Sequence, residues 1–181
     1  LRTCVREAHM NGRVVVFVEP IALYMTKDLH EPGDKLWSFP YPDVKEEIEL
    51  GEFHVEGEGK DLTIITYGNG VYYSQKAIKR LRENTKKSVK LIDLRWISSI
   101  QYEKLVNNID PNSKVLIVDE CRKTGSLSEA LVAGLVEHSK VIPKIKVLAA
   151  TNCFIPLGPG ATSGLPLEDD ILKACEDLLG T

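Results

Sequence analysis

A series of short, nearly continuous apolar segments most limits the folds open to this chain. "LTIITY", "VKLIDL", "KVLIVDE" and "IKVLAA" follow one another between residues 51 and 181, each separated from the next by a segment with helical features. Unbroken apolar runs of this length are typical of strands buried on both faces of a parallel sheet. "EFHVEGE" is a candidate for one further, short strand. The alternation predicts a three-layer α/β/α domain with a mostly parallel, five-stranded sheet.

The connecting segments carry recognisable helix signals. Apolar or small residues recur at positions 71, 74, 78, 81 and 85, which is the spacing of one helix face. Ser126 and Glu129 have the spacing of a capping box, so we expect a helix to begin there and to end near His138. "QYEKLVNNI" and the closing segment, residues 168–179, are also predicted to be helical.

Residues 1–50 follow a different pattern. Helical spacing near Leu1 stops at Gly12, and the β-branched run at residues 14–18 predicts a strand that ends at Pro20. One helix and one strand cannot form a core, so residues 1–24 are predicted to end a preceding domain. The chain begins without a methionine, and we expect it to be a fragment. Residues 25–50 keep no regular period among their prolines and charges, which indicates a linker lying on a surface.

Composition argues against several classes of function. The formal net charge of −3 gives no positive field for nucleic acid, so no nucleic-acid partner is expected. No apolar run approaches the roughly 18 residues of a membrane span, so no membrane segment is expected. No cysteine belongs to a C-x-x-C pair or to a Cys/His cluster with zinc spacing, which predicts free thiols and no metal site. The cysteines are Cys4, Cys121, Cys153 and Cys175.

The stretch "LTIITYGNGVYYSQKAI", residues 62–78, has the strand–glycine–helix order of a dinucleotide-binding motif. Gly68 and Gly70 match its first two glycines, but Tyr73 stands where the third glycine lets the helix approach the strand. Asp93 ends the next strand, where an acid for the ribose is expected, but Arg95 follows closely and suggests another use. We therefore predict a tight turn that binds no nucleotide. An anion at the exposed helix N-terminus is a generic alternative.

Taken in order, four segments resemble a known family: "DLTIITYGNGV", "VKLIDLRWIS", "KVLIVDECRKTGSLSEAL" and "FIPLGP". The series is similar to the C-terminal, transketolase-type domain of thiamine-diphosphate enzymes. It most resembles the beta subunit, or the beta half of a fused chain, of the decarboxylating component of 2-oxoacid dehydrogenase complexes. "GRVVVFVEPIALY" is similar to the end of the pyrimidine-binding domain that precedes it in this family.

One departure leaves the subtype open. The family often continues "DLR" with a turn resembling x-x-P-L-D, but Ser98, Ser99, Ile100 and Gln101 stand at the matching positions. The pyruvate and branched-chain subtypes usually share that turn. "DLRW" together with "FIPLGP" favours a fused or less-studied bacterial branch.

The resemblance implies an intact enzyme that decarboxylates a 2-oxoacid oxidatively and passes the acyl group to lipoamide. In such an enzyme the alpha part holds thiamine diphosphate and Mg²⁺, and a glutamate early in the pyrimidine-binding domain activates the cofactor. Glu19 lies late on its predicted strand and does not match that glutamate. We therefore assign no catalytic, cofactor-binding or metal-binding residue, and expect the fragment alone to be inactive and to bind no cofactor. A cytoplasmic location is expected, or the mitochondrial matrix in a eukaryote.

The resemblance also implies a role in assembly for residues 51–181. The expected partners are the alpha part, a second beta copy in a dimer, and the subunit-binding domain of the lipoyl acyltransferase. Strand carboxyl ends form the crevice of an open α/β sheet, and Asp–Arg pairs there would fix loops. The predicted interface residues at these ends are Asp93, Arg95, Asp119, Glu120 and Arg122.

Three alternatives remain. The charged residues can be ordinary surface ion pairs of little energetic value. The chain can also belong to another thiamine enzyme, such as a transketolase or a deoxyxylulose-phosphate synthase, whose C-terminal domains share this fold. A stand-alone α/β module that binds a small anion is the third possibility.

Overall fold

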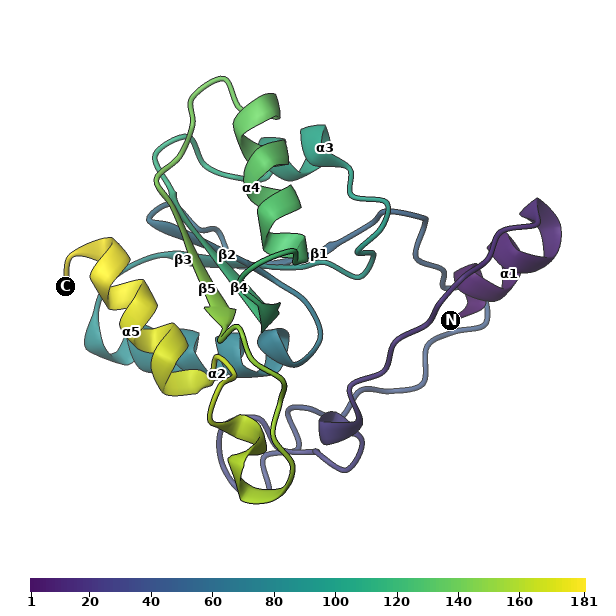
Figure 1. The fold of residues 1–181 in the computed structure, drawn as a ribbon, viewed down its shortest axis with the longest axis horizontal. Coiled ribbons are helices and arrows are strands. Elements are labelled where there is room, and N and C mark those ends of the chain that lie inside the picture. Colours follow the sequence, from purple (N-terminus) through teal and green to yellow (C-terminus); the bar gives the residue numbers. More distant parts are fainter.

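The computed structural model describes residues 1–181, and one sheet organises most of them (Figure 1). The strand order is β1-β3-β2-β4-β5. Strand β1 pairs antiparallel with β3, and every other pair is parallel, which confirms the predicted mostly parallel sheet. The strands are β1 (His54–Glu56), β2 (Leu62–Thr66), β3 (Val89–Asp93), β4 (Lys114–Arg122) and β5 (Ile145–Ala150).

Helices cover both faces of the sheet, as predicted. α2 (Asn69–Asn84) and α5 (Glu168–Leu179) lie on one face, and α3 (Tyr102–Asn107) and α4 (Leu127–His138) lie on the other. Successive strand residues point to opposite faces, so Ile64 joins the core beneath α2 and α5 whereas Ile65 joins the core beneath α3 and α4. Both cores need apolar residues from the same strand, and this explains the unbroken apolar runs.

The N-terminal segment differs from its predicted form at one point. Helix α1 (Arg2–Asn11) ends as expected at Gly12, which adopts the left-handed conformation with φ of 62°. Residues 14–18, however, form no strand and are largely exposed. A strand needs a neighbouring chain segment to bond its N–H and C=O groups, and residues 14–18 form no backbone hydrogen bond with any other segment. The β-branched run therefore has the residue preferences of a strand but lacks a neighbouring strand to pair with.

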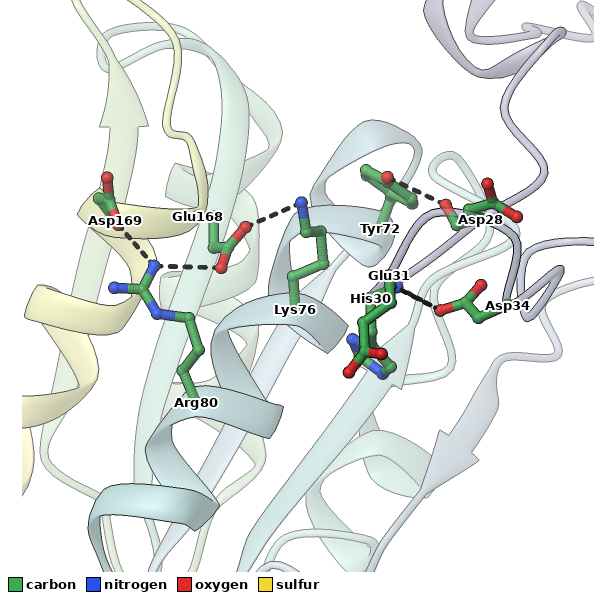
Figure 2. A network of polar contacts seen from close by, with 9 residues as sticks. All are labelled: Asp28, His30, Glu31, Asp34, Tyr72, Lys76, Arg80, Glu168 and Asp169. Carbon is green, nitrogen blue, oxygen red and sulfur yellow. Dashed lines mark hydrogen bonds and ion pairs between the residues drawn. The ribbon is translucent and has the colours of Figure 1, made fainter.

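The linker of residues 25–50 contacts two parts of the structure: its first part forms a fixed loop on α2, and residues 42–48 lie against α1. The carboxylate of Asp34 accepts hydrogen bonds from four backbone N–H groups, at 2.7 to 3.0 Å. Burial tends to raise the pKa of Asp34, but these donors outweigh it and hold the pKa well below its usual range. The loop contacts α2 where the Tyr72 hydroxyl donates to the Asp28 carbonyl at 3.1 Å (Figure 2). Trp37 of the loop also packs edge-on against Tyr72.

Candidate assembly site at the strand carboxyl ends

The carboxyl ends of β2, β4 and β5 open onto a pocket of about 610 Å³. Most of its lining is apolar, and the loop after β5 contributes much of it. Phe154 in this loop is 99% exposed, and Leu157 nearby is almost fully exposed. Contiguous exposed apolar side chains of this kind mark contact surfaces in soluble proteins. The apolar lining includes Ile97, Leu127, Phe154, Ile155, Pro156 and Leu165.

Asp119 is buried behind Tyr67 and Cys121, which line this pocket, and does not line it itself. Its carboxylate accepts hydrogen bonds from the Tyr67 hydroxyl at 2.6 Å and from the N–H groups of Cys121 and Ser128, each at 2.9 Å. Burial tends to raise the pKa of Asp119, but its hydrogen bonds, led by that from Tyr67, outweigh burial and lower the pKa. Burial and Asp119 together raise the pKa of Tyr67. Asp119 therefore orders the site from within and has no exposed surface for a partner.

Asp119 also explains why the predicted capping box does not form. Ser126 is the N-cap of α4, as predicted, but its side chain makes no capping hydrogen bond. Glu129 instead accepts a hydrogen bond from the N–H of Gly125, at 3.1 Å. The N–H of Ser128 in the first turn of α4 already bonds to Asp119. The carboxylate from the sheet thus takes the place of the cap, and its negative charge suits the helix N-terminus.

Glu120 lies over the glycine turn that precedes α2. Its Oε2 accepts a hydrogen bond from the Asn69 side chain at 2.8 Å, and a Cβ added to Gly68 would lie 3.0 Å from its Oε1. The phosphates of a dinucleotide would bind at this helix N-terminus and would meet the Glu120 carboxylate. Tyr73 packs against the core beneath α2. Both features support the prediction that this turn binds no nucleotide, and Glu120 opposes a small anion there as well.

The remaining predicted residues lie at the same end of the sheet but differ in their contacts. Arg122 lines the pocket and donates from Nε to the carbonyl of Thr124 at 3.0 Å. Arg95 Nε lies 3.6 Å from Asp93 Oδ2, at the end of β3 and outside the pocket lining. Burial raises the pKa of Asp93, although Arg95 and His54 oppose this. The structure thus places Glu120 and Arg122 in the lining of the pocket, with Asp119 buried behind it, and leaves the Asp93–Arg95 pair outside.

Several residues of the site were not predicted from the sequence. Asn152 joins the loop after β5 to the loop after β4, through hydrogen bonds of 3.2 and 3.1 Å with Thr124. Tyr67 and Asn69 hold the two acids of β4. These contacts join segments 28 to 52 residues apart, which no local pattern encodes. The only signal available was that Tyr67 and Asn69 directly follow a buried strand.

A second hollow, of about 250 Å³, lies between the loop at His30, α2 and the start of α5 (Figure 2). Five of its six charged residues are paired with one another, and the sixth is Glu83: Glu168 contacts Lys76 at 3.0 Å and Arg80 at 3.1 Å. Glu168 accordingly raises the pKa of Lys76. Lys79 pairs with Glu31 at 3.3 Å. The hollow therefore offers no surplus charge to a ligand and serves to join α2 to its neighbours.

Two further findings concern metals and membranes. No group of three or more His, Cys, Asp or Glu side chains is arranged to hold a metal ion. None of the helices combines the length and the apolar character needed to cross a bilayer.

All four cysteines are free, and two of them, Cys121 and Cys153, line the 610 Å³ pocket.

Comparison with known proteins assigns the domain of residues 51–165 to a family. The model of the family "Transketolase, C-terminal domain" matches residues 51–165. The pyruvate dehydrogenase E1 component subunit beta of Staphylococcus aureus (strain Mu50 / ATCC 700699) is 29% identical over 140 residues, covering 76% of this chain and 43% of the relative. The same subunit of Bacillus subtilis (strain 168) is 28% identical over 167 residues, covering 91% of this chain and 48% of the relative.

The chain thus spans less than half the length of these curated relatives. A solved structure described as a split gene transketolase, inactive beta4 tetramer, superposes with a TM-score of 0.62 at 24% identity, covering 77% of this chain and 46% of that one. This likeness shows a shared fold. Because the family match covers the sheet and most of its helices, the resemblance inferred from the sequence is confirmed, and the chain belongs to the transketolase C-terminal domain family.

Proposed function

We propose that residues 51–181 are the assembly domain of a thiamine-diphosphate-dependent 2-oxoacid dehydrogenase of the pyruvate dehydrogenase type. The similarity to two E1 beta subunits supports this assignment. The observation that carries it is the chemistry of the strand carboxyl ends. Their acids, Asp119 and Glu120, already have hydrogen-bond partners within the chain, whereas Phe154 and Leu157 are exposed. Such a surface suits a protein partner better than a polar substrate.

In this proposal the intact enzyme decarboxylates a 2-oxoacid oxidatively and transfers the acyl group to lipoamide, in the cytoplasm or, in a eukaryote, in the mitochondrial matrix. The partners are the alpha part, a second beta copy and the subunit-binding domain of the lipoyl acyltransferase. Arg122 at the rim and the Asp93–Arg95 pair beside it would contact these partners.

The residues of this chain do not fit thiamine diphosphate and Mg²⁺. The diphosphate needs a metal held by oxygen ligands, and no suitable cluster of acidic side chains is present. The helix N-terminus at the glycine turn faces the carboxylate of Glu120, which would repel the diphosphate. The cofactor of the intact enzyme is therefore expected to bind to other parts of the assembly.

The test is to weaken the exposed apolar surface within the intact enzyme. Phe154→Asp places a charge where the proposal puts a desolvated contact, so we expect less complete complex by light scattering and a matching loss of activity. Val44→Asp is the matched control, because Val44 is also largely exposed but lies in the segment before the domain. Melting temperatures of the isolated variants should equal that of the parent. Full assembly of the Phe154→Asp enzyme would contradict the proposal.

A further inference from the structure

We propose that Cys121 and Cys153 are a reversible redox pair: a hydroperoxide joins them in a disulfide within the chain, which closes the 610 Å³ pocket and withdraws Phe154 from the partner surface. This inference rests on the assembly role proposed above and deepens it, because it names a regulation of the same site. Both thiols line the pocket, one from the end of β4 and the other from the loop after β5.

An irregularity in β4 accounts for the position of the first thiol. The pairing of β4 with β5 passes from Asp119 directly to Arg122, while the partner strand advances by one residue. Glu120 and Cys121 therefore have no partner on β5. Bulges of this kind change the direction of side chains and are frequent beside functional sites. Cys121 is exposed, and its Sγ lies 3.6 Å from the Tyr67 hydroxyl.

The loop that carries Cys153 is fixed at its base and free beyond it. The base is held where Asn152 forms hydrogen bonds of 3.2 and 3.1 Å with Thr124, in the loop after β4. Every hydrogen bond of residues 153–163 stays within the loop itself. Phe154 is 99% exposed and so has little packing to lose. The loop can therefore turn toward the end of β4 without breaking a hydrogen bond to the sheet.

The other two thiols do not suit the same chemistry. Cys175 is 1% exposed, and burial raises its pKa to about 12, which keeps the thiol protonated. Cys4 belongs to α1, before the domain, and lines neither hollow. Oxidation selects cysteines that are accessible and can form a thiolate, and it produces a disulfide where a second thiol is near. Within the domain, both exposed thiols lie at one pocket.

The reaction is a two-electron oxidation with a hydroperoxide as the oxidant. The thiolate of one cysteine attacks a peroxide oxygen, the O–O bond breaks, and a sulfenic acid forms while the leaving oxygen takes up a proton as water or an alcohol. The second thiol then attacks the sulfenic sulfur, forms the S–S bond and releases water. A small dithiol reverses the step and becomes a disulfide itself. Disulfides of reducing compartments are usually transient ones of this kind.

The disulfide would change the shape of the pocket. It holds its two Cα atoms about 4.4–6.8 Å apart, so the loop after β5 would be drawn over the end of β4 and would fill the space between the thiols. Phe154 directly follows Cys153 and would move with it. Phe154 is the most exposed of the large apolar side chains. Assembly that depends on this side chain should therefore weaken on oxidation and recover on reduction.

The first experiment looks for the disulfide in the full chain. After brief treatment with hydrogen peroxide, thiol titration in denaturant should count two free thiols in place of four. Trypsin should release residues 115–122 and 147–173 as one linked pair of peptides, which dithiothreitol separates. Cys121→Ser and Cys153→Ser should each abolish the linked pair, and Cys4→Ser, the matched control, should retain it. Equal melting temperatures of the reduced proteins would show that folding is unchanged.

The second experiment tests the consequence in the intact enzyme. The enzyme is oxidised with hydrogen peroxide, freed of peroxide with catalase, and examined by light scattering, and each variant is compared with its own reduced form. We expect oxidation to lower the amount of complete complex severalfold in the parent, and dithiothreitol to restore it. In the Cys121→Ser enzyme oxidation should have little effect, because serine cannot form the disulfide. Unspecific oxidative damage would instead lower assembly equally in both enzymes.

The outcomes separate this inference from the assembly role. A linked peptide pair that needs both cysteines, together with a reversible loss of complex in the parent alone, would support the redox pair. Peroxide that oxidises each thiol separately, or that links them between two chains, would overturn it, and so would a disulfide that leaves assembly unchanged. None of these results decides the assembly role itself, which is tested by the Phe154→Asp enzyme.

Discussion

Replacing Asp119 by alanine should destabilise the domain severely, because three donors would lose one shared acceptor. The hydrogen bond from the N–H of Ser128 is buried and that from the Tyr67 hydroxyl is partly buried, whereas the third donor belongs to Cys121, an exposed residue. A hydrogen bond to a charged group contributes about 1.5–3 kcal/mol, and a donor left buried without a partner costs a similar amount. Counting the first two donors alone, we expect a loss of about 3–6 kcal/mol in the free energy of unfolding. Domains of this size have about 5–15 kcal/mol in total.

Urea unfolding followed by circular dichroism measures this loss. Asp119→Asn keeps one oxygen acceptor and should cost less than Asp119→Ala, and Tyr67→Phe should cost about 1.5–3 kcal/mol, the contribution of one hydrogen bond to a charged group. The double variant Tyr67→Phe with Asp119→Ala should be less destabilised than the sum of the singles, since the two residues share one hydrogen bond. A loss below about 1 kcal/mol for Asp119→Ala, or strict additivity in the double variant, would refute this account of the site.

The same substitution has a predictable pH dependence. The pKa of Asp119 is lowered by folding, so its stabilising contribution is fully present above the ordinary aspartate pKa and is lost as pH falls through the lowered value. The stability difference between the parent and Asp119→Ala should therefore be constant near neutral pH and should shrink in strong acid. A difference that grows on acidification would contradict the assignment of the charged form to the folded state.

Four further predictions follow from the site and its surroundings. The chain alone should neither bind thiamine diphosphate with Mg²⁺ in calorimetry nor release CO₂ from pyruvate, and sub-micromolar binding would mean that the cofactor site has been misplaced. Titration with NAD should give no saturable signal, because Glu120 and Tyr73 oppose a nucleotide at the glycine turn; a micromolar Kd would overturn this. Gly70→Ala should lower the melting temperature, since the new Cβ would lie 2.0 Å from Thr66 Oγ1 inside the core. Trp37→Ala should speed proteolysis of the loop around Asp34, whereas Phe39→Ala, at a more exposed ring, should do so less, and equal rates would count against the packing on Tyr72.

The layers of the fold could be predicted because burial on both faces marks each strand in the sequence. Ile64 and Ile65 must both be apolar, since one faces each core, and the same holds along β3 and β4. Residues 14–18 are also an unbroken apolar run and yet form no strand. An apolar run indicates a preference for burial, but it does not provide the neighbouring strand that a sheet requires. Strand formation is a property of two segments, and only one of them is visible in a local pattern.

The site was predicted only in outline for a similar reason. The topology rule for parallel sheets located the charged residues at the strand carboxyl ends, but it could not tell a buried acid from an exposed one. Asp119 was expected at an interface and is instead enclosed by Tyr67 and the start of α4. The Ser126 and Glu129 signal located the start of α4 correctly and assigned its cap to the wrong carboxylate. Capping between distant segments competes with local capping, and the sequence shows only the local candidate.

The two acids of β4 explain why this crevice presents an apolar surface. Consecutive strand residues point to opposite faces, so Asp119 turns toward α4 and Glu120 turns toward α2. Each carboxylate lies at the N-terminus of a helix, where the exposed N–H groups of a parallel α/β sheet would otherwise attract an anionic ligand. Because a carboxylate of the chain already lies at each of these two helix N-termini, neither one is free to attract a small anion. The surface that remains accessible at the carboxyl ends is the apolar loop around Phe154. Removing apolar side chains from water lowers the free energy, so this loop favours contact with another protein surface.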